Sequence, residues 1–189
     1  MADVVLGIDS STQSTKVEAR ELDTGMVLAS ASASHPPTTP PVSEQDPQAW
    51  WSALVQACND LPQPIRDRVG AISVAGQQHG LVLLDDAGTP VRPAKLWNDT
   101  TSASEATALV DALSPDGWAQ AIGSLPVAAF TISKLAWVAN HEPENLARVA
   151  KVMLPHDYLT WCLSGRHVTD RGDASGTGWF DPSTNTYQP

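Results

Sequence analysis

The stretch that decides the fold is Val4-Val5-Leu6-Gly7-Ile8-Asp9-Ser10-Ser11-Thr12-Gln13-Ser14-Thr15-Lys16-Val17. Its apolar run is typical of a buried strand that ends on a carboxylate, breaks into a short hydroxyl-rich turn and resumes as strand at Val17. Such a turn offers backbone N–H groups and hydroxyls to phosphate oxygens. An aspartate at the strand end can hold Mg²⁺, often through water. An ordinary hairpin with a polar turn is the competing interpretation.

Composition and charge restrict the class of protein. The 189 residues include 42% hydrophobic and 17% charged residues and carry a formal net charge of −10, which fits a soluble globular domain. The acidic balance argues against nucleic acid or an anionic membrane as a partner, although one local loop can still bind a nucleotide phosphate.

The chain lacks the patterns of a membrane or secreted protein. No apolar run reaches the roughly 20 residues that a membrane span needs, and the first residues, Met1-Ala2-Asp3, show no signal-peptide pattern. Only Cys58 and Cys162 are present, without the spacing of a zinc site or a disulfide framework. We therefore expect a cytoplasmic protein.

The order of predicted elements indicates an α/β fold with a mixed sheet flanked by helices. Three consecutive strands are expected at about 3–9, 14–22 and 26–34, before a proline-rich connector at 35–41. A helix is expected from Pro47, with Asp46 as its N-cap and Trp50, Leu54 and Ala57 as its buried stripe. Later segments predict strands at 69–75 and 81–85 and helices at 99–113, 115–122, 131–141 and 156–164.

A second group of polar residues, Gly76-Gln77-Gln78-His79-Gly80, joins two of these strands. Two amides and an imidazole displayed at a sheet edge match the hydroxyls of a polyol. The alternatives are a β-turn with a solvent-facing histidine and a satisfied core histidine. A metal role for His79 is disfavoured because no second ligand stands at a suitable spacing.

Trp97-Asn98-Asp99 marks the expected start of a helix, with Asn98 or Asp99 as its N-cap. The same indole could also lie against the apolar face of a sugar, with polar neighbours for its hydroxyls. In the later helix we expect Thr131 to be the cap and Lys134 to lie on a solvated face rather than act as a base.

In combination these segments resemble the FGGY family of carbohydrate kinases, which have the actin-like ATPase, ribonuclease-H-like fold. The resemblance covers essentially the whole chain, and its motifs follow in order and spacing at 7–16, 76–80, 96–99, 130–141, 154–159 and 170–177. Within the family the chain is most similar to members that act on D-xylulose.

The resemblance implies an activity and a set of site residues. The complete enzyme would use ATP and Mg²⁺ to phosphorylate D-xylulose to D-xylulose 5-phosphate, as part of xylose metabolism. The implied sugar-binding residues are Gln78, His79, Trp97, Asn98 and Asp99. The implied phosphate-binding residues are Thr12, Gln13, Ser14 and Lys16. Asp9 would support the metal and phosphate, holding Mg²⁺ through water.

The resemblance also implies that residues 1–189 form an incomplete N-terminal domain, which carries the sugar site and the first phosphate loop. The general-base aspartate of the family and the C-terminal domain that holds adenine would lie beyond residue 189. We therefore expect this fragment alone to be inactive, and the resemblance allows a homodimer of the complete enzyme.

Three alternatives stay open. The chain could belong to another FGGY sugar or polyol kinase, or it could be a non-catalytic sugar-binding or interaction module of the same fold. It could also be an actin-like or chaperone-type ATPase without a small-molecule acceptor. The Gln77-Gln78-His79 turn argues against the last, because such an ATPase has no need of polyol-binding groups there.

Overall fold

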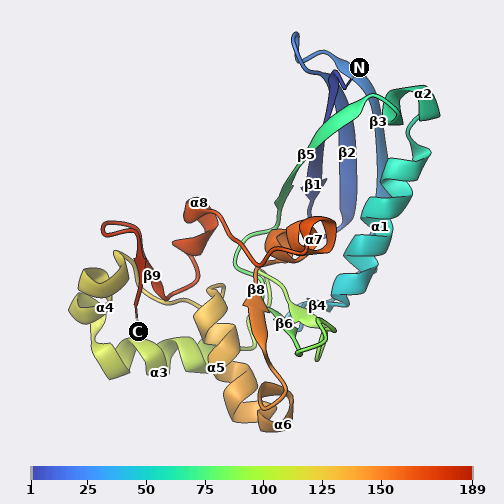
Figure 1. Ribbon diagram of the computed structural model, residues 1–189. Coiled ribbons are helices and arrows are strands. Elements are labelled where there is room, and N and C mark those ends of the chain that lie inside the picture. The colour runs from blue at the N-terminus through green and yellow to red at the C-terminus, as the bar shows by residue number, and fades with distance from the viewer. Residues whose placement is uncertain (1, 189) are drawn as a thin grey trace.

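A computed structural model describes residues 2–188 of the chain. Figure 1 shows an elongated molecule with a twisted sheet and its long helix at one end and a group of shorter helices at the other. The expected α/β fold with a mixed, helix-flanked sheet is confirmed.

The main sheet has four strands in the order β3-β2-β1-β5. The first three strands pair antiparallel, whereas β5 runs parallel to β1. Because β1 and β5 are parallel, both end at the same edge of the sheet, which is where polar site residues can gather. The bounds are β1 Val4–Ser10, β2 Ser14–Glu21, β3 Val27–Ser34 and β5 Val69–Gly76.

The remaining elements are short strands and helices, many of which lie away from this sheet at the other end of the molecule (Figure 1). The short strands are β4 Glu44–Gln45, β6 Val82–Leu84, β7 Ala94–Lys95, β8 Lys151–Met153, β9 Phe180–Asp181 and β10 Thr186–Tyr187. The helices are α1 Pro47–Asp60, α2 Gln63–Arg66, α3 Ala103–Leu113, α4 Pro115–Ile122, α5 Thr131–His141, α6 Pro143–Leu146, α7 Pro155–Ser164 and α8 Arg171–Ala174.

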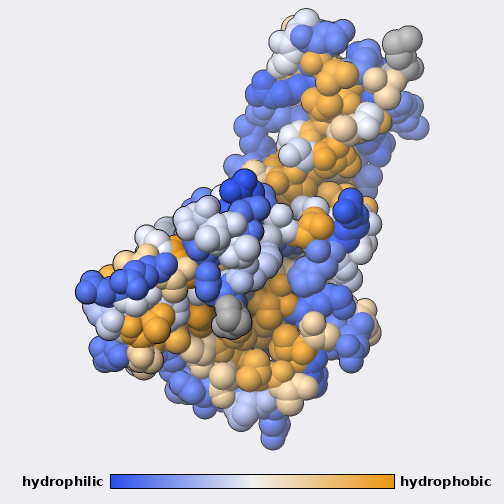
Figure 2. Space-filling model, turned by 60° about the vertical axis from the view of Figure 1, so that its left-hand side comes forward, coloured by the Kyte–Doolittle hydropathy of each residue, from blue (hydrophilic) through white to orange (hydrophobic). Residues whose placement is uncertain are grey.

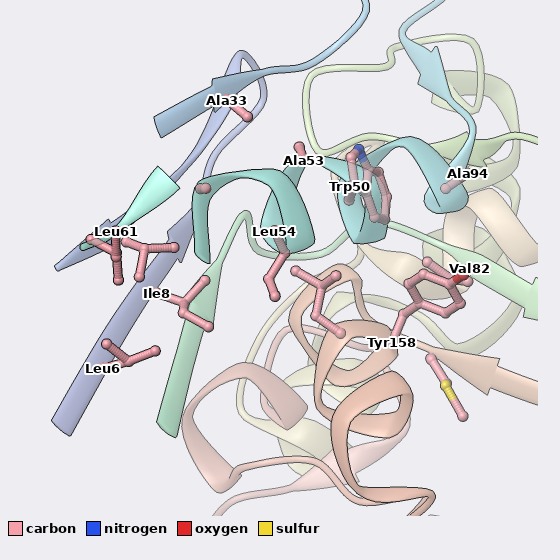
Figure 3. Close-up of a cluster of buried hydrophobic side chains, with 14 of the residues drawn as sticks. Leu6, Ile8, Ala33, Trp50, Ala53, Leu54, Leu61, Val82, Ala94 and Tyr158 are labelled. Atoms are coloured by element: carbon pink, nitrogen blue, oxygen red, sulfur yellow. The ribbon is translucent and has the colours of Figure 1, made fainter. Parts of the chain in front are cut away.

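The core lies between one face of the main sheet and α1, as Figure 3 shows. In β1 the buried residues alternate with open ones, so that Leu6 and Ile8 face the core while Gly7 and Asp9 face away. The predicted stripe of α1 is confirmed, and Trp50 is fully buried with its ring edge-on to Tyr158 of α7. Asp46 caps α1 by accepting the Gln48 N–H.

One predicted helix start and one predicted helix cap are wrong. The helix expected at residue 99 begins at Ala103 with Ser102 as its N-cap, because the Asp99 side chain is occupied elsewhere in the interior. Thr131 is the first residue of α5 rather than its cap, which is Phe130. The helices expected at 115–122 and 131–141 have the predicted bounds.

Figure 2 shows that apolar side chains cover part of the sheet-bearing end and continue into the hollow at the waist of the molecule. The edge strand β5 contributes Ile72, which is 45% exposed. Within residues 2–188, each helix is too short or too polar to cross a membrane.

Candidate functional site

A turn of three residues, 11–13, separates β1 from β2 at the end of the sheet. The N–H and the hydroxyl of Ser11 both donate to the Ser14 carbonyl, at 3.0 and 3.2 Å, and so close the turn. The Thr12 N–H donates to no acceptor within residues 2–188. A free N–H beside hydroxyls is the arrangement that binds a phosphate oxygen.

A cavity of about 760 Å³ opens beside this turn, within the size range of small-molecule sites. Its lining includes Thr12 and Gln13 of the turn, the proline-rich connector, and Trp97 and Asn98. The Trp97 indole is 49% exposed, and its N–H donates to Thr12 Oγ1 at 3.1 Å. The structure therefore brings predicted sugar-binding and phosphate-binding residues together around one cavity.

Asp9 lies on the open face of the sheet, opposite α1. It lines a second hollow of about 360 Å³ together with Lys16 and Ser73. No hydrogen bond or ion pair involves the Asp9 carboxylate among residues 2–188. The carboxylate lies beside the turn at 11–13 and is free to bind a cation. Carboxylate oxygen is the kind of hard ligand that Mg²⁺ prefers.

The other two predicted phosphate-binding residues belong to β2 rather than to the turn. Lys16 stands opposite Asp9 in the register, and its ammonium pairs with Glu18 at 2.7 Å. Ser14 is the first residue of β2 and pairs with Ser34 of β3. Both lie next to the turn, but Lys16 would have to leave Glu18 to contact a phosphate.

The turn at 76–80 leaves the sheet at the same edge as the turn at 11–13. Gly76 pairs with Ser10, and the Gln77 N–H donates to the Ser10 carbonyl at 3.0 Å. Gln78 is exposed, whereas His79 is half-buried with a φ of 60°. Neither Gln78 nor His79 lines the two hollows described above.

The His79 ring is enclosed by residues from later in the chain. Its centroid lies 5.3 Å from that of Phe130, and Thr131 Oγ1 donates to the His79 carbonyl at 3.2 Å. A Cβ at Gly176 would collide with the imidazole, so only glycine fits there. Burial lowers the pKa of His79, which keeps the ring neutral and able to both donate and accept hydrogen bonds near pH 7.

Several buried polar atoms at this edge have no partner within residues 2–188. They are both amide atoms of Gln77, Oδ1 of Asn98 and Nδ1 of His79. Buried polar groups in native proteins are nearly always hydrogen-bonded, so such orphans suit a polar ligand. Our sequence interpretation chose Gln78 and overlooked Gln77, because the sequence does not show which of two adjacent amides turns inward.

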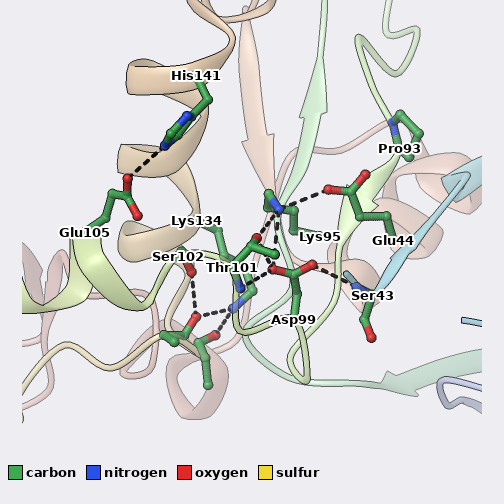
Figure 4. Close-up of polar contacts among 12 residues, drawn as sticks. Ser43, Glu44, Pro93, Lys95, Asp99, Thr101, Ser102, Glu105, Lys134 and His141 are labelled. Carbon is green, nitrogen blue, oxygen red and sulfur yellow. Dashed lines mark hydrogen bonds and ion pairs between the residues drawn. The ribbon is translucent and has the colours of Figure 1, made fainter. Parts of the chain in front are cut away.

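Asp99 is fully buried, and its carboxylate already has protein partners. It accepts the Ser43 N–H at 2.8 Å, the Thr101 hydroxyl at 2.5 Å and the Lys95 ammonium at 3.3 Å, as Figure 4 shows. Burial opposes ionisation, but these hydrogen bonds and the Lys95 charge outweigh it and hold the pKa of Asp99 below its usual value. The carboxylate anchors the segment that carries Trp97.

The charge of Lys95 is itself completely buried. Its ammonium pairs with Glu44 at 3.0 Å and lies 3.8 Å from the centroid of the Trp137 ring. Two carboxylates and an aromatic face therefore surround this ammonium, so its burial is compensated.

Lys134 contradicts our expectation of a solvated face. The side chain is fully buried, and its ammonium donates to the carbonyls of Ala128 and Ala129. Burial lowers the pKa of Lys134 to about 7. The helical spacing predicted the helix but not the segment before it, which folds over this side chain.

A histidine among carboxylates lies next to the 76–80 turn. His156 Nε2 is 3.0 Å from both Asp157 and Asp170, and Nδ1 is 3.2 Å from Asp173. Burial opposes protonation, but the three carboxylates outweigh it and raise the pKa of His156. These carboxylates therefore stabilise the protonated form of the imidazole.

Comparison with known proteins gives consistent results. The profile of the FGGY family of carbohydrate kinases, N-terminal domain, matches residues 4–189. The xylulose kinase of Streptomyces coelicolor is 49% identical over 185 residues, covering 97% of this chain and 38% of that protein. The chain therefore spans well under half the length of this curated relative.

Solved structures agree with this result. The xylulose kinase of Bifidobacterium adolescentis has a TM-score of 0.88 at 39% identity, with 99% of this chain and 42% of that chain covered. The xylulose kinase of Rhodospirillum rubrum has a TM-score of 0.90 at 28% identity, with 98% and 39% covered.

Proposed function

This chain belongs to the FGGY family of carbohydrate kinases, and from that membership we propose that it supplies the sugar site and first phosphate loop of an ATP-dependent D-xylulose kinase. The observation that carries the proposal is the cavity of about 760 Å³, where the hydroxyl-rich turn and the Trp97-Asn98 segment meet. The matched relatives named xylulose kinase favour D-xylulose over other sugars.

Phosphoryl transfer requires positioning and charge stabilisation more than covalent chemistry from the protein. We assign the N–H groups and hydroxyls of the turn, with Thr12, Gln13 and Ser14, to the phosphate. Lys16 would assist after leaving Glu18. When bound, Mg²⁺ neutralises charge on the phosphates, and Asp9 is the residue that would hold it.

The sugar would lie on the Trp97 indole beside Asn98, and its hydroxyls would extend from the cavity toward the unpartnered amide of Gln77 and neutral His79, which lie outside the cavity lining. Asn98 Oδ1 can accept a hydrogen bond from one sugar hydroxyl, and the Gln77 amide offers both a donor and an acceptor. Gln78, which is exposed, would approach the sugar only from the rim. Asp99 acts by holding the indole in place.

We propose that residues beyond this chain supply the general base and the adenine site, as the 38% coverage of the Streptomyces relative supports. The edge strand β5 has no outer neighbour among residues 2–188 and exposes Ile72, which is consistent with a sheet that further residues extend. The complete kinase would act in the cytoplasm in xylose metabolism.

The test is an assay of the complete kinase with Mg·ATP and a panel of D-xylulose, other ketoses, gluconate and glycerol. We expect D-xylulose to give the highest kcat/KM and D-xylulose 5-phosphate as its product. A higher value for another sugar would replace the substrate but keep the reaction. Sugar binding without phosphoryl transfer, and without any effect of nucleotide, would instead identify a non-catalytic module.

A further inference from the structure

Two buried side chains outside the phosphate loop, His35 and Gln45, hold that loop through hydrogen bonds. We propose that both are positioning residues for phosphoryl transfer, which keep Ser11, Thr12 and Gln13 in the conformation that accepts phosphate. The contacts stand on the structure alone, whereas their effect on transfer rests on the proposed function.

His35 follows the end of β3 and is 7% exposed. Its Nε2 lies 2.8 Å from Thr15 Oγ1, and that hydroxyl donates in turn to Ser10 Oγ at 3.1 Å. The His35 N–H donates to the Gln13 carbonyl at 2.8 Å. This residue therefore contacts the turn itself and the start of β2, and through Thr15 it is linked to the end of β1.

Gln45 holds the turn from another side and is 3% exposed. Its amide nitrogen donates to the carbonyls of Thr12, at 2.9 Å, and Pro36, at 2.6 Å. Its amide oxygen accepts the indole N–H of Trp50 at 2.8 Å, and Trp50 is a fully buried residue of α1. The turn is thus connected through one amide to the core and to the proline-rich connector.

These contacts occupy the carbonyls of Thr12 and Gln13, whose partial negative charge would repel a phosphate. The N–H of Thr12 is left without a protein partner in the described chain. A loop that is ordered before the ligand arrives loses little conformational entropy on binding, and this preorganisation favours transfer. Gln45 does not line the cavity, so removing its amide should loosen the loop without changing the sugar site, whereas His35 also lines the cavity.

The variants follow from the geometry. Gln45→Met keeps the length of the side chain but removes the amide, and His35→Leu removes the imidazole. His35→Gln places an amide nitrogen near the position of Nε2 and should restore most of the function. Gln48→Met is the matched control, because Gln48 is an exposed residue in the first turn of α1.

The experiment measures two quantities in the complete kinase. Hydrogen exchange of residues 11–14 reports whether the loop is ordered, independently of turnover. Steady-state kinetics and D-xylulose binding report positioning. In Gln45→Met and His35→Leu we expect loop exchange to become faster and either KM for ATP to rise or kcat to fall, by about tenfold. In Gln45→Met, whose site lies outside the cavity lining, D-xylulose affinity should stay within about twofold of wild type.

Loop exchange that stays at the wild-type rate in both variants would overturn the proposal. Faster exchange with unchanged kcat and KM for ATP would also overturn it, because the contacts would then be structural only. Should His35→Leu fail to fold, Gln45→Met and His35→Gln decide the result. A wild-type protein that transfers no phosphate would refute the proposed function. The comparison of loop exchange between wild type and the variants would still show whether these contacts order the loop.

Discussion

The Trp97 indole N–H donates to Thr12 Oγ1 across 3.1 Å, although the two residues are 85 positions apart in sequence. Trp97 belongs to the proposed sugar site and Thr12 to the proposed phosphate loop. The bond therefore links the two proposed sites beside a single cavity.

This link predicts coupling between the two side chains. Trp97→Phe keeps an aromatic ring for the sugar but removes the N–H, and Thr12→Val removes its acceptor. In a double-mutant cycle on kcat/KM we expect a coupling of about 1 kcal/mol, which is the typical net value of one hydrogen bond. Strictly additive effects would show that the bond contributes nothing to catalysis.

Gly176 lies so close to His79 that no side chain fits between them. Gly176→Ala should displace the imidazole and raise KM for D-xylulose by about tenfold, with a smaller effect on KM for ATP. In a His79→Ala background the same substitution should have little further effect. An equal penalty in both backgrounds would mean that Gly176 does not act through His79.

Asp99 is expected to be a structural anchor. Asp99→Asn keeps the shape of the side chain but removes the charge that faces Lys95, so the free energy of unfolding should fall by about 3 kcal/mol. Urea denaturation measures this change, with exposed Asp86→Asn as the control. Unchanged stability together with a raised KM for D-xylulose would instead identify Asp99 as a direct sugar ligand.

The buried ammonium of Lys134 predicts a pH dependence of stability. Its pKa is lowered to about 7 by burial, whereas in the unfolded chain it is about 10.4. Between these values the unfolded chain binds a proton that the native protein does not, so stability rises with pH.

The check compares wild type with Lys134→Met by urea denaturation at pH 7 and pH 9. The stability of wild type relative to the variant should increase by about 2 kcal/mol over this range. Parallel pH profiles would show that Lys134 stays protonated in the fold.

Much of the fold could be predicted because its signals are local. The three N-terminal strands and the Asp46 cap follow from hydrophobic periodicity and capping chemistry within a few residues. The same signals fail near Asp99, whose partner Ser43 is 56 residues away. A tertiary contact of this kind overrides a capping preference and delays the start of α3.

The candidate site was predictable only in part for the same reason. The types of residue that surround the cavity were recognisable from motifs, but the burial of Lys134 and the inward turn of Gln77 depend on distant segments. The supports of the phosphate loop were also missed, because His35 and Gln45 carry no local sign of their contacts with it.

The central claim is that Asp9 serves the phosphate and metal side of a kinase while the sugar binds elsewhere. The most direct test measures kcat with Mg·ATP and D-xylulose, and D-xylulose binding by tryptophan fluorescence, in the complete Asp9→Ala kinase. We predict a loss of kcat of at least about 100-fold with sugar affinity within about twofold. The exposed turn variant Asp23→Asn should match wild type, and near-normal turnover of Asp9→Ala would contradict the account.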